Sequence, residues 1–357
     1  MKTYIKFLIN IFLKSFIKVF LIFFTLIVLL NIFEQIDFFK EIEVSFTLPL
    51  FLSLLNAPSV IFEIMPFIFL ISSQIFFIYL IENNELQIFK YSGLTNLKII
   101  KILGIFTFFF GILFIIFFYN FSSKLQNMYL EIKNTYTNDN KYLAVITENG
   151  IWIKDEIDQQ INIINASKVD DKFLINTVIV QFTKNHDYIK TIKSKKIDIS
   201  SYSWELYDSL VSENNKNEYI QKFKLMSNFD LEKINSLFSN LSSLSMLEIF
   251  KLRKNYKTLN YSLTEIDSHL IVLFSYPFYL TIMTILSSII MFNIGYQKNL
   301  FFNVVFGIFV SVIIYYVNNF FSVLGTTEKI PVSMSILLPL VLLVIINSIF
   351  IMKLNEK

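Results

Sequence analysis

Six apolar runs, each long enough to cross a lipid bilayer, constrain this sequence more than any other feature. They occupy residues 16–33, 60–81, 99–119, 269–292, 300–321 and 334–352. A helix needs about 20 apolar residues to cross a hydrocarbon core of ~30 Å, and each run meets or approaches that length. The first run lacks a small-residue cleavage site behind it, so we expect a retained helix rather than a signal peptide. The sequence therefore predicts a polytopic α-helical membrane protein.

The gap between the third and fourth runs has a different composition and a different period. Residues 122–267 hold most of the Asn, Asp and Lys, and apolar residues alternate with polar ones as in half-buried strands. From about residue 229 the pattern is helical, and Ser245 with Glu248 fits a capping box. The predicted strands are 142–146, 150–154, 160–164, 173–182, 188–192, 204–210 and 219–226. Several short strands without intervening helices predict an antiparallel sandwich or jelly roll, inserted between two sets of three spans.

Lysines in the short loops predict the orientation of the spans. With the N-terminus inside, the inner segments hold most of these lysines, and the short outer loops hold Lys40 and Lys329. The positive-inside rule then places both termini in the cytoplasm and the β insert outside, since long domains cross regardless of charge. The inner lysines are Lys2, Lys6, Lys14, Lys90, Lys98, Lys101, Lys298, Lys353 and Lys357.

The residues that catalysis requires are largely missing. The chain has no Cys and no phosphate-binding G-x-x-x-x-G-K-[ST] motif, so it cannot cradle ATP in a P-loop. Its two histidines, His186 and His269, are far apart in the sequence, which argues against a metal site. A net charge of +3 is too small to indicate nucleic acid. We therefore expect no catalytic residue, no metal and no cofactor.

A short charged stretch at residues 82–93 lies between the second and third runs. Leu86 and Phe89 are three residues apart and share one helix face, and Gly93 follows as a natural helix stop. This pattern predicts a small amphipathic helix at the inner end of two spans, where a soluble partner can push on the membrane protein. The alternative is a solvated loop that only reverses the chain.

Charged residues also follow the first run. Glu34, Asp37 and Lys40 are spaced by three, which would place them on one side of an extended first helix. One interpretation is that they line the outer mouth of a cavity for a charged amphiphile. The alternative is a solvated helix end, where a charge costs little.

The order of these features resembles the lipopolysaccharide-export permease family, LptF/LptG, over essentially the whole chain. Residues 84–95 resemble the coupling segment of that family, a polar residue and Glu-Leu followed by a Gly. The stretch 150–155, Gly-Ile-Trp-Ile-Lys-Asp, resembles the opening of the exported domain on the LptG side. The remaining matches are Trp204–Leu206, Pro58, Pro66, Pro277 and the prolines 331 and 339 that flank the start of the sixth run.

The resemblance implies half of a heterodimeric permease, without enzymatic activity of its own, in the bacterial inner membrane. Its expected partners are an LptF-like second permease, a dimer of an LptB-like cytoplasmic ATPase, a single-span LptC-like protein and lipopolysaccharide. It implies residues 1–121 as spans one to three with a coupling helix at 82–95, 122–267 as a periplasmic β domain, and 268–357 as spans four to six. The ATPase-coupling residues would be Glu82, Glu85, Leu86, Phe89 and Gly93.

Two other functions remain open at this level. One is a mechanotransmission ABC permease, which usually carries its exported domain after the first span. The other is a membrane-anchored sensor or scaffold whose β domain binds an external ligand; it would not need the 82–93 segment to contact an ATPase.

Overall fold

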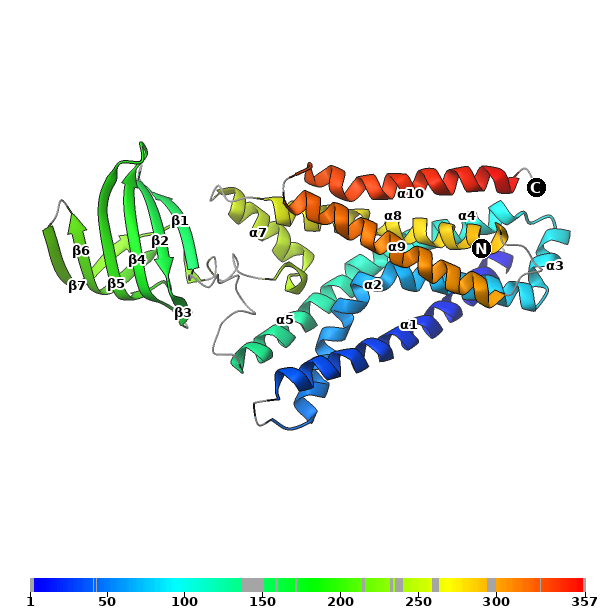
Figure 1. The fold of residues 1–357 in the computed structure, drawn as a ribbon, viewed down its shortest axis with the longest axis horizontal. Coiled ribbons are helices and arrows are strands. Elements are labelled where there is room, and N and C mark those ends of the chain that lie inside the picture. Colours follow the sequence, from blue (N-terminus) through cyan, green and yellow to red (C-terminus); the bar gives the residue numbers. More distant parts are fainter. Residues whose placement is uncertain are drawn as a thin grey trace. The chain divides into compact units, whose positions relative to one another are not determined.

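The computed structural model describes residues 3–355 except 41, 43, 137–150, 158–159, 171, 214–215, 232–233, 235–239, 259–262, 294–299 and 328. The chain forms two compact units, which we call the membrane unit and the β unit. The membrane unit comprises Met1–Gln126 and Thr264–Lys357, and the β unit comprises Asn127–Leu263. Figure 1 shows long helices in the first and a sheet in the second. The predicted strand at 142–146 and Lys298 lie outside the described residues.

Six candidate membrane spans occur in the described part of the chain, three before the sheet and three after it. This confirms the predicted three-plus-three plan. The third span continues from α4 through a π-helical turn into α5. The helices of the membrane unit are α1 (Thr3–Phe38), α2 (Thr47–Glu82), α3 (Glu85–Tyr91), α4 (Asn96–Phe114), η1 (Ile115–Tyr119), α5 (Asn120–Thr135, which runs on into the β unit), α8 (Thr264–Asn293), α9 (Leu300–Thr326) and α10 (Val332–Asn355).

The second span begins earlier than the sequence predicts. The apolar run at 60–81 predicts a span that starts near residue 60, after a connection over 42–58, whereas α2 begins at Thr47 and contains both Pro58 and Pro66. Pro49 lies in the first turn of α2, where a missing N–H removes no helical hydrogen bond. Prolines that would break a soluble helix are compatible with a span when neighbouring helices satisfy the freed carbonyls.

The contact between α2 and α8 shows this compensation directly. Pro66 cannot donate to the carbonyl of Phe62, four residues earlier. The hydroxyl of Tyr276 on α8 donates to that carbonyl over 2.6 Å. The rings of Phe62 and Tyr276 stack with centroids 4.5 Å apart and planes 5° apart. The helical hydrogen bond that Pro66 removes from α2 is therefore replaced by one from a side chain more than 200 positions later in the chain.

Helix α2 is the core of the membrane unit. In its most apolar stretch 67% of the residues are buried, against 22% in α1 and 17% in α9. A second polar contact ties it to α9, because the side-chain amide of Gln74 donates to the carbonyl of Asn303 over 2.8 Å. Gly307 leaves the room that this amide occupies. Helices α1, α8 and α9 thus pack on α2, whereas α4 and α10 pack on α8, and α1 and α9 keep broad apolar faces exposed.

Small residues determine how closely α4 packs against α8. A Cβ at Gly111 would lie 2.9 Å from the Cα of Pro277, whereas a Cβ at Gly104 would meet its nearest atoms, on Thr281 and Ile285, at 3.7 Å. Close backbone approach at small residues is the usual basis of helix packing in membranes.

The β unit contains one antiparallel sheet. Its strands follow the order β1-β2-β4-β5-β6-β7, with β3 paired to β4 beyond the end of β2. The strands are β1 (Ile151–Ile157), β2 (Gln160–Ala166), β3 (Lys168–Asp170), β4 (Phe173–Thr183), β5 (Tyr188–Asp198), β6 (Ser203–Glu213) and β7 (Lys216–Met226). The prediction of an antiparallel β insert is confirmed. The described strands form a single meandering sheet rather than two sheets packed face to face.

The inner face of the sheet forms a core with the segment that follows β7. Trp204 is fully buried and donates its indole N–H to the carbonyl of Phe229 over 2.7 Å. The buried residues are Ile153, Ile164, Ala166, Leu174, Ile179, Ile192, Ile197, Ile199, Trp204, Leu206, Phe229 and Ile234. One face of a flat sheet could not enclose these side chains, so the sheet curves and brings its two edge strands toward each other.

A buried carboxylate closes this curl. Asp155 on β1 accepts hydrogen bonds from the hydroxyl of Ser227 at 2.8 Å and the side-chain amide of Asn228 at 2.8 Å. It also accepts the backbone N–H of Asn228 at 3.2 Å. Only 1% of Asp155 is exposed, and three donors compensate its desolvation. Strand β1 is thereby tied to the end of β7, the strand at the other edge of the sheet.

One row across the sheet, which we call the crease, interrupts the alternation of buried and exposed residues. The crease residues lie opposite one another on successive strands. The residues just before and just after each of them pair with the neighbouring strand in regular register. The buried positions in β5 are 192 and 194 before the crease but 197 after it, followed by 199 just past the end of the strand, so the parity reverses. Asn176 and Asp208 have φ of 48° and 50°, a region that Asn and Asp tolerate. The crease consists of Ser167, Asn176, Lys195, Asp208 and Gln221.

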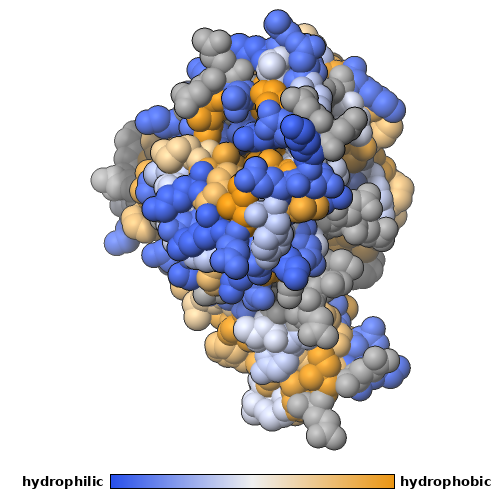
Figure 2. All heavy atoms as spheres, turned by 90° about the vertical axis from the view of Figure 1, so that its left-hand side faces the viewer, coloured by the Kyte–Doolittle hydropathy of each residue, from blue (hydrophilic) through white to orange (hydrophobic). Residues whose placement is uncertain are grey.

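Outside the core the β unit is hydrophilic. Figure 2 shows mostly hydrophilic side chains on the end of the unit nearest β6 and β7, with apolar ones between them. Helix α7 (Met246–Thr258) completes the unit. It starts with the predicted capping box, since the carboxylate of Glu248 accepts the backbone N–H of Ser245 at 2.8 Å and its hydroxyl at 2.7 Å.

We expect Gly111→Ala to destabilise the membrane unit by about 1–3 kcal/mol, because the added methyl group forces α4 away from the backbone of Pro277. Gly104→Ala is the matched control and should be neutral or slightly stabilising, since its methyl group meets only ordinary contacts. Unfolding of the detergent-solubilised protein measures both variants. Equal stabilities would contradict the close approach at Gly111.

We expect Asp155→Ala to destabilise the β unit by roughly 2–3 kcal/mol, because three buried donors lose their acceptor. Hydrogen exchange of β1 amides in the full-length protein measures the change. Glu213→Ala, an exposed acid at the end of β6, should leave those rates within about two-fold. Unchanged protection of β1 in Asp155→Ala would show that this carboxylate does not hold the sheet closed.

Candidate functional site

The short helix α3 and the turns on both sides of it form the candidate site. It connects α2 to α4 at one end of the membrane unit, and Figure 1 shows both chain termini at that same end. The helix spans Glu85–Tyr91. It therefore presents a folded element, rather than an irregular loop, beyond the ends of two spans.

Local backbone chemistry fixes both ends of α3. Asn84 has φ of 57° and turns the chain out of α2. At the other end Gly93 has φ of 78°, its N–H donates to the carbonyl of Lys90, and the next N–H, of Leu94, donates to Phe89. These two bonds form a Schellman motif, which stops a helix at a residue with positive φ. The predicted stop at Gly93 is thus explained by its backbone.

The inner face of α3 holds it on the membrane unit. Leu86 is completely buried, and the ring of Phe89 meets the ring of Phe7 on α1 edge to face at 6.0 Å. The outer face carries two large apolar side chains in solvent, Ile88 with 59% exposed and Tyr91 with 89% exposed. Ile88 and Tyr91 are three residues apart, as Leu86 and Phe89 are, so the sequence alone does not show which of the two pairs is exposed.

Glu85 carries the unusual electrostatics of the site. One carboxylate oxygen of Glu85 is shielded from solvent and has no hydrogen-bond partner among the described residues. Loss of solvation raises the pKa of Glu85 above its ordinary value. Glu82, at the end of α2, is exposed. A carboxylate that has lost part of its hydration without gaining hydrogen bonds in return is suited to pair with a basic group from another protein.

The second group of predicted residues lies at the other end of α1. Glu34 and Asp37 are exposed in its last turns, and Lys40 is exposed in the turn that follows the helix. The backbone N–H of Lys40 donates to the carbonyl of Asp37 at 3.3 Å. The structure therefore places Glu34 and Asp37 one turn apart on α1, with Lys40 past the helix end rather than on it.

The two histidines have separate local settings. His269 on α8 shares a 2.9 Å hydrogen bond with the hydroxyl of Tyr119 at the π-helical turn. His186 lies in the turn between β4 and β5 with φ of 66°. Within the described ranges no three His, Asp or Glu side chains come together as metal ligands would.

A comparison with protein families decides among the functions that the sequence left open. The model of the lipopolysaccharide export system permease LptF/LptG matches residues 6–353. The chain belongs to this family. No individually curated protein matches the sequence.

Membership of the LptF/LptG family defines the role of the permease. It is a transmembrane subunit of an ABC-type lipopolysaccharide exporter in the inner membrane, and the ATP is hydrolysed by a partner protein. Three spans on each side of the β unit agree with this role. The family also decides against the sensor or scaffold and against the mechanotransmission permease.

We expect Gly93→Ala to loosen the end of α3 by about 1–2 kcal/mol, because an L side chain is strained at a φ of 78°. The cost is purely conformational, since no atom lies within 4 Å of the position the methyl group would take. Hydrogen exchange of the Leu94 amide, which donates to Phe89, should accelerate by about five- to thirty-fold. Gly93→Asn is the control and should change it less, because Asn tolerates this region. Equal rates in the two variants would contradict the backbone explanation.

Proposed function

We propose that α3 receives the stroke of a cytoplasmic ATPase dimer and transmits it to the spans, and that this drives lipopolysaccharide out of the membrane. The observation that carries the proposal is the division of α3 into an anchored face and a free face. Leu86 and Phe89 hold it against the membrane unit, while Ile88 and Tyr91 remain in solvent. The proposed coupling set is thus Glu82, Glu85, Leu86, Phe89 and Gly93, with Ile88 and Tyr91 added.

The anchoring supports transmission rather than mere docking. The ring contact between Phe89 and Phe7 joins α3 to the beginning of α1, and α3 also packs on α2. A displacement of α3 by a docked protein would therefore move the inner ends of two spans together. In this scheme Leu86 and Phe89 hold α3 on the membrane unit, and Glu85, Ile88 and Tyr91 contact the ATPase.

The lysine distribution supports an orientation with both termini and α3 in the cytoplasm and the β unit in the periplasm. Glu34 lies 27 residues after Phe7 along α1, or about 40 Å in an α-helix. Residues Glu34, Asp37 and Lys40 would then lie at the periplasmic end, at the mouth of the cavity that admits the lipid. Their exposure supports contact with a charged head group.

Exposed apolar faces on the spans support a second permease subunit and a lipid substrate. Helix α1 exposes Leu21, Leu26, Leu30 and Phe33, and the most apolar stretch of α9 is the least buried of the six. We propose an LptF-like partner in a heterodimer, a cavity for acyl chains between the two permeases, and an LptC-like single-span protein that continues the path. Transfer to the β unit would use its apolar interior.

We assign the chain to the LptG side of the family on the Gly-Ile-Trp-Ile-Lys-Asp stretch at 150–155. Its last residue, Asp155, is the carboxylate that closes the sheet, which gives the stretch a structural role. Co-expression with an LptF and with an LptG from related exporters tests the assignment. A stable complex with LptG and none with LptF would overturn it.

We expect Glu85→Ala to weaken docking of the ATPase by at least about ten-fold, because a cation buried at the interface would lose its carboxylate partner. Gln87→Ala, which removes an exposed polar side chain from the same helix, is the control and should dock normally. Copurification and lipopolysaccharide release from proteoliposomes are the measurements. Normal docking and release in Glu85→Ala would contradict the coupling role.

The raised pKa of Glu85 adds a pH dependence to this test. Docking to a cation needs the ionised carboxylate, so affinity should fall on acidification at a pH above the ordinary range of a glutamate. Glu85→Gln should remove this part of the pH dependence.

A further inference from the structure

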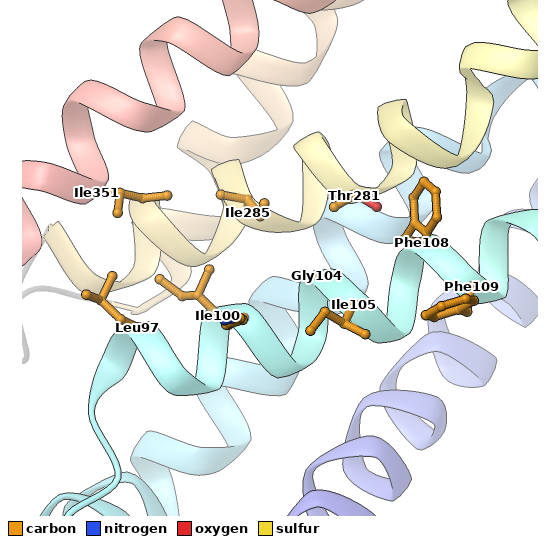
Figure 3. Close-up of a pocket in the computed structure, with 10 residues that line it drawn as sticks. Leu97, Ile100, Gly104, Ile105, Phe108, Phe109, Thr281, Ile285 and Ile351 are labelled. Atoms are coloured by element: carbon orange, nitrogen blue, oxygen red, sulfur yellow. The ribbon is translucent and has the colours of Figure 1, made fainter.

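An apolar groove runs along the surface of the membrane unit between α4 and α8, at the end that carries α3. Its volume is about 520 Å³. Figure 3 shows side chains from α4 and α8 beside it, with Ile351 of α10 near one end. The lining residues are Leu97, Ile100, Lys101, Gly104, Ile105, Phe108, Phe109, Thr281, Ile285 and Ile351.

The lining offers hydrocarbon contact over the depth of one leaflet. Phe109 follows Leu97 by 12 positions on the α4 wall, which corresponds to about 18 Å of helix. Half of a ~30 Å hydrocarbon core is ~15 Å. Thr281 adds little polarity, because its hydroxyl donates to the carbonyl of Pro277 at 2.8 Å. Gly104 removes one side chain from the wall and so deepens the groove.

The charge at the groove is positive and lies at one end of it. Lys101 is the charged residue among those that line it, and Lys98 is exposed one turn earlier on α4. Both lie within the first turns of α4, close to the membrane surface on the α3 side. A lysine at that depth can extend its amine to the head-group level while its methylenes remain in the apolar region.

We propose that this groove binds one acyl chain of an anionic phospholipid, with the lipid phosphate at Lys101. The shape fits a single chain, and the positive charge of Lys101 favours an acidic head group. That the lipid comes from the cytoplasmic leaflet rests on the orientation proposed above. The site thus differs in leaflet and in helices from the proposed lipopolysaccharide path at α1 and α9.

The test uses the full-length permease, with its partner subunits, in nanodiscs of phosphatidylcholine. A trace of phosphatidylglycerol with a photoreactive acyl chain is the probe, and mass spectrometry locates the label. We expect labelling on 97–109 and 281–285, about five-fold stronger than with the matching phosphatidylcholine probe. Lys101→Ala should abolish most of this preference, while Lys14→Ala on α1 should retain it.

Two bulky variants separate filling of the groove from general disturbance. Ile105→Trp places an indole in the groove and should remove the label from both segments, at a position already 51% exposed. Leu113→Trp, at a position of α4 that is 55% exposed outside the groove, should not. Labelling spread evenly over all six spans, equal labelling by the two lipids, or crosslinks of the groove to a protein subunit would overturn the proposal.

These measurements need neither nucleotide nor lipopolysaccharide. A failure of the Glu85 docking test therefore removes the proposed coupling function and leaves the lipid site standing. The reverse outcome removes the lipid site alone.

Discussion

A carbonyl that loses its helical donor inside a bilayer must find another one, and this requirement organises the membrane unit. In α2 the proline at 66 frees the carbonyl of Phe62, and a tyrosine hydroxyl from α8 satisfies it. The same pair of helices is joined again where the hydroxyl of Ser287 donates to the carbonyl of Leu70 at 2.8 Å. Helix α2 can therefore be both proline-containing and central, with α1, α8 and α9 packed around it.

Because α2 is buried, a force on the short helix α3 that follows it would reach the core of the membrane unit. Helix α3 follows the end of α2 after a two-residue turn and rests on α1 through one aromatic contact. A force on α3 is thus applied to the most buried span and to one of the most exposed ones. Helix α1 packs mainly on α2, and only 22% of its most apolar stretch is buried. This asymmetry suits a permease that must open and close around a lipid.

Much of this fold could be predicted from local sequence patterns, and the misses have physical reasons. The six spans, the sheet segments and the helix stop at Gly93 depend on nearest-neighbour chemistry that a sequence displays. The start of α2 was missed because Pro58 was taken as the end of a connection, whereas α2 runs through it and packs against neighbouring spans. The strand predicted at 188–192 ended short of Asp198 because the alternation reverses at Lys195. Exposure of Ile88 and Tyr91 depends on which face of α3 is covered, which only tertiary structure defines. The same is true of the shielded oxygen of Glu85, which has no hydrogen-bond partner in the described part of the chain.

The crease makes the lengths of its strands interdependent. A deletion of Lys195 alone would restore strict alternation in β5 and keep Ile197 and Ile199 in phase with Ile192, but it would shift the pairing of β5 with β4 and β6 by one residue beyond that point. The same holds for Asn176 in β4 and Asp208 in β6. Single-residue insertions and deletions at this level are therefore costly one at a time and tolerable only as a set. Any attempt to lengthen, shorten or graft this sheet has to treat the row across it as one unit of construction.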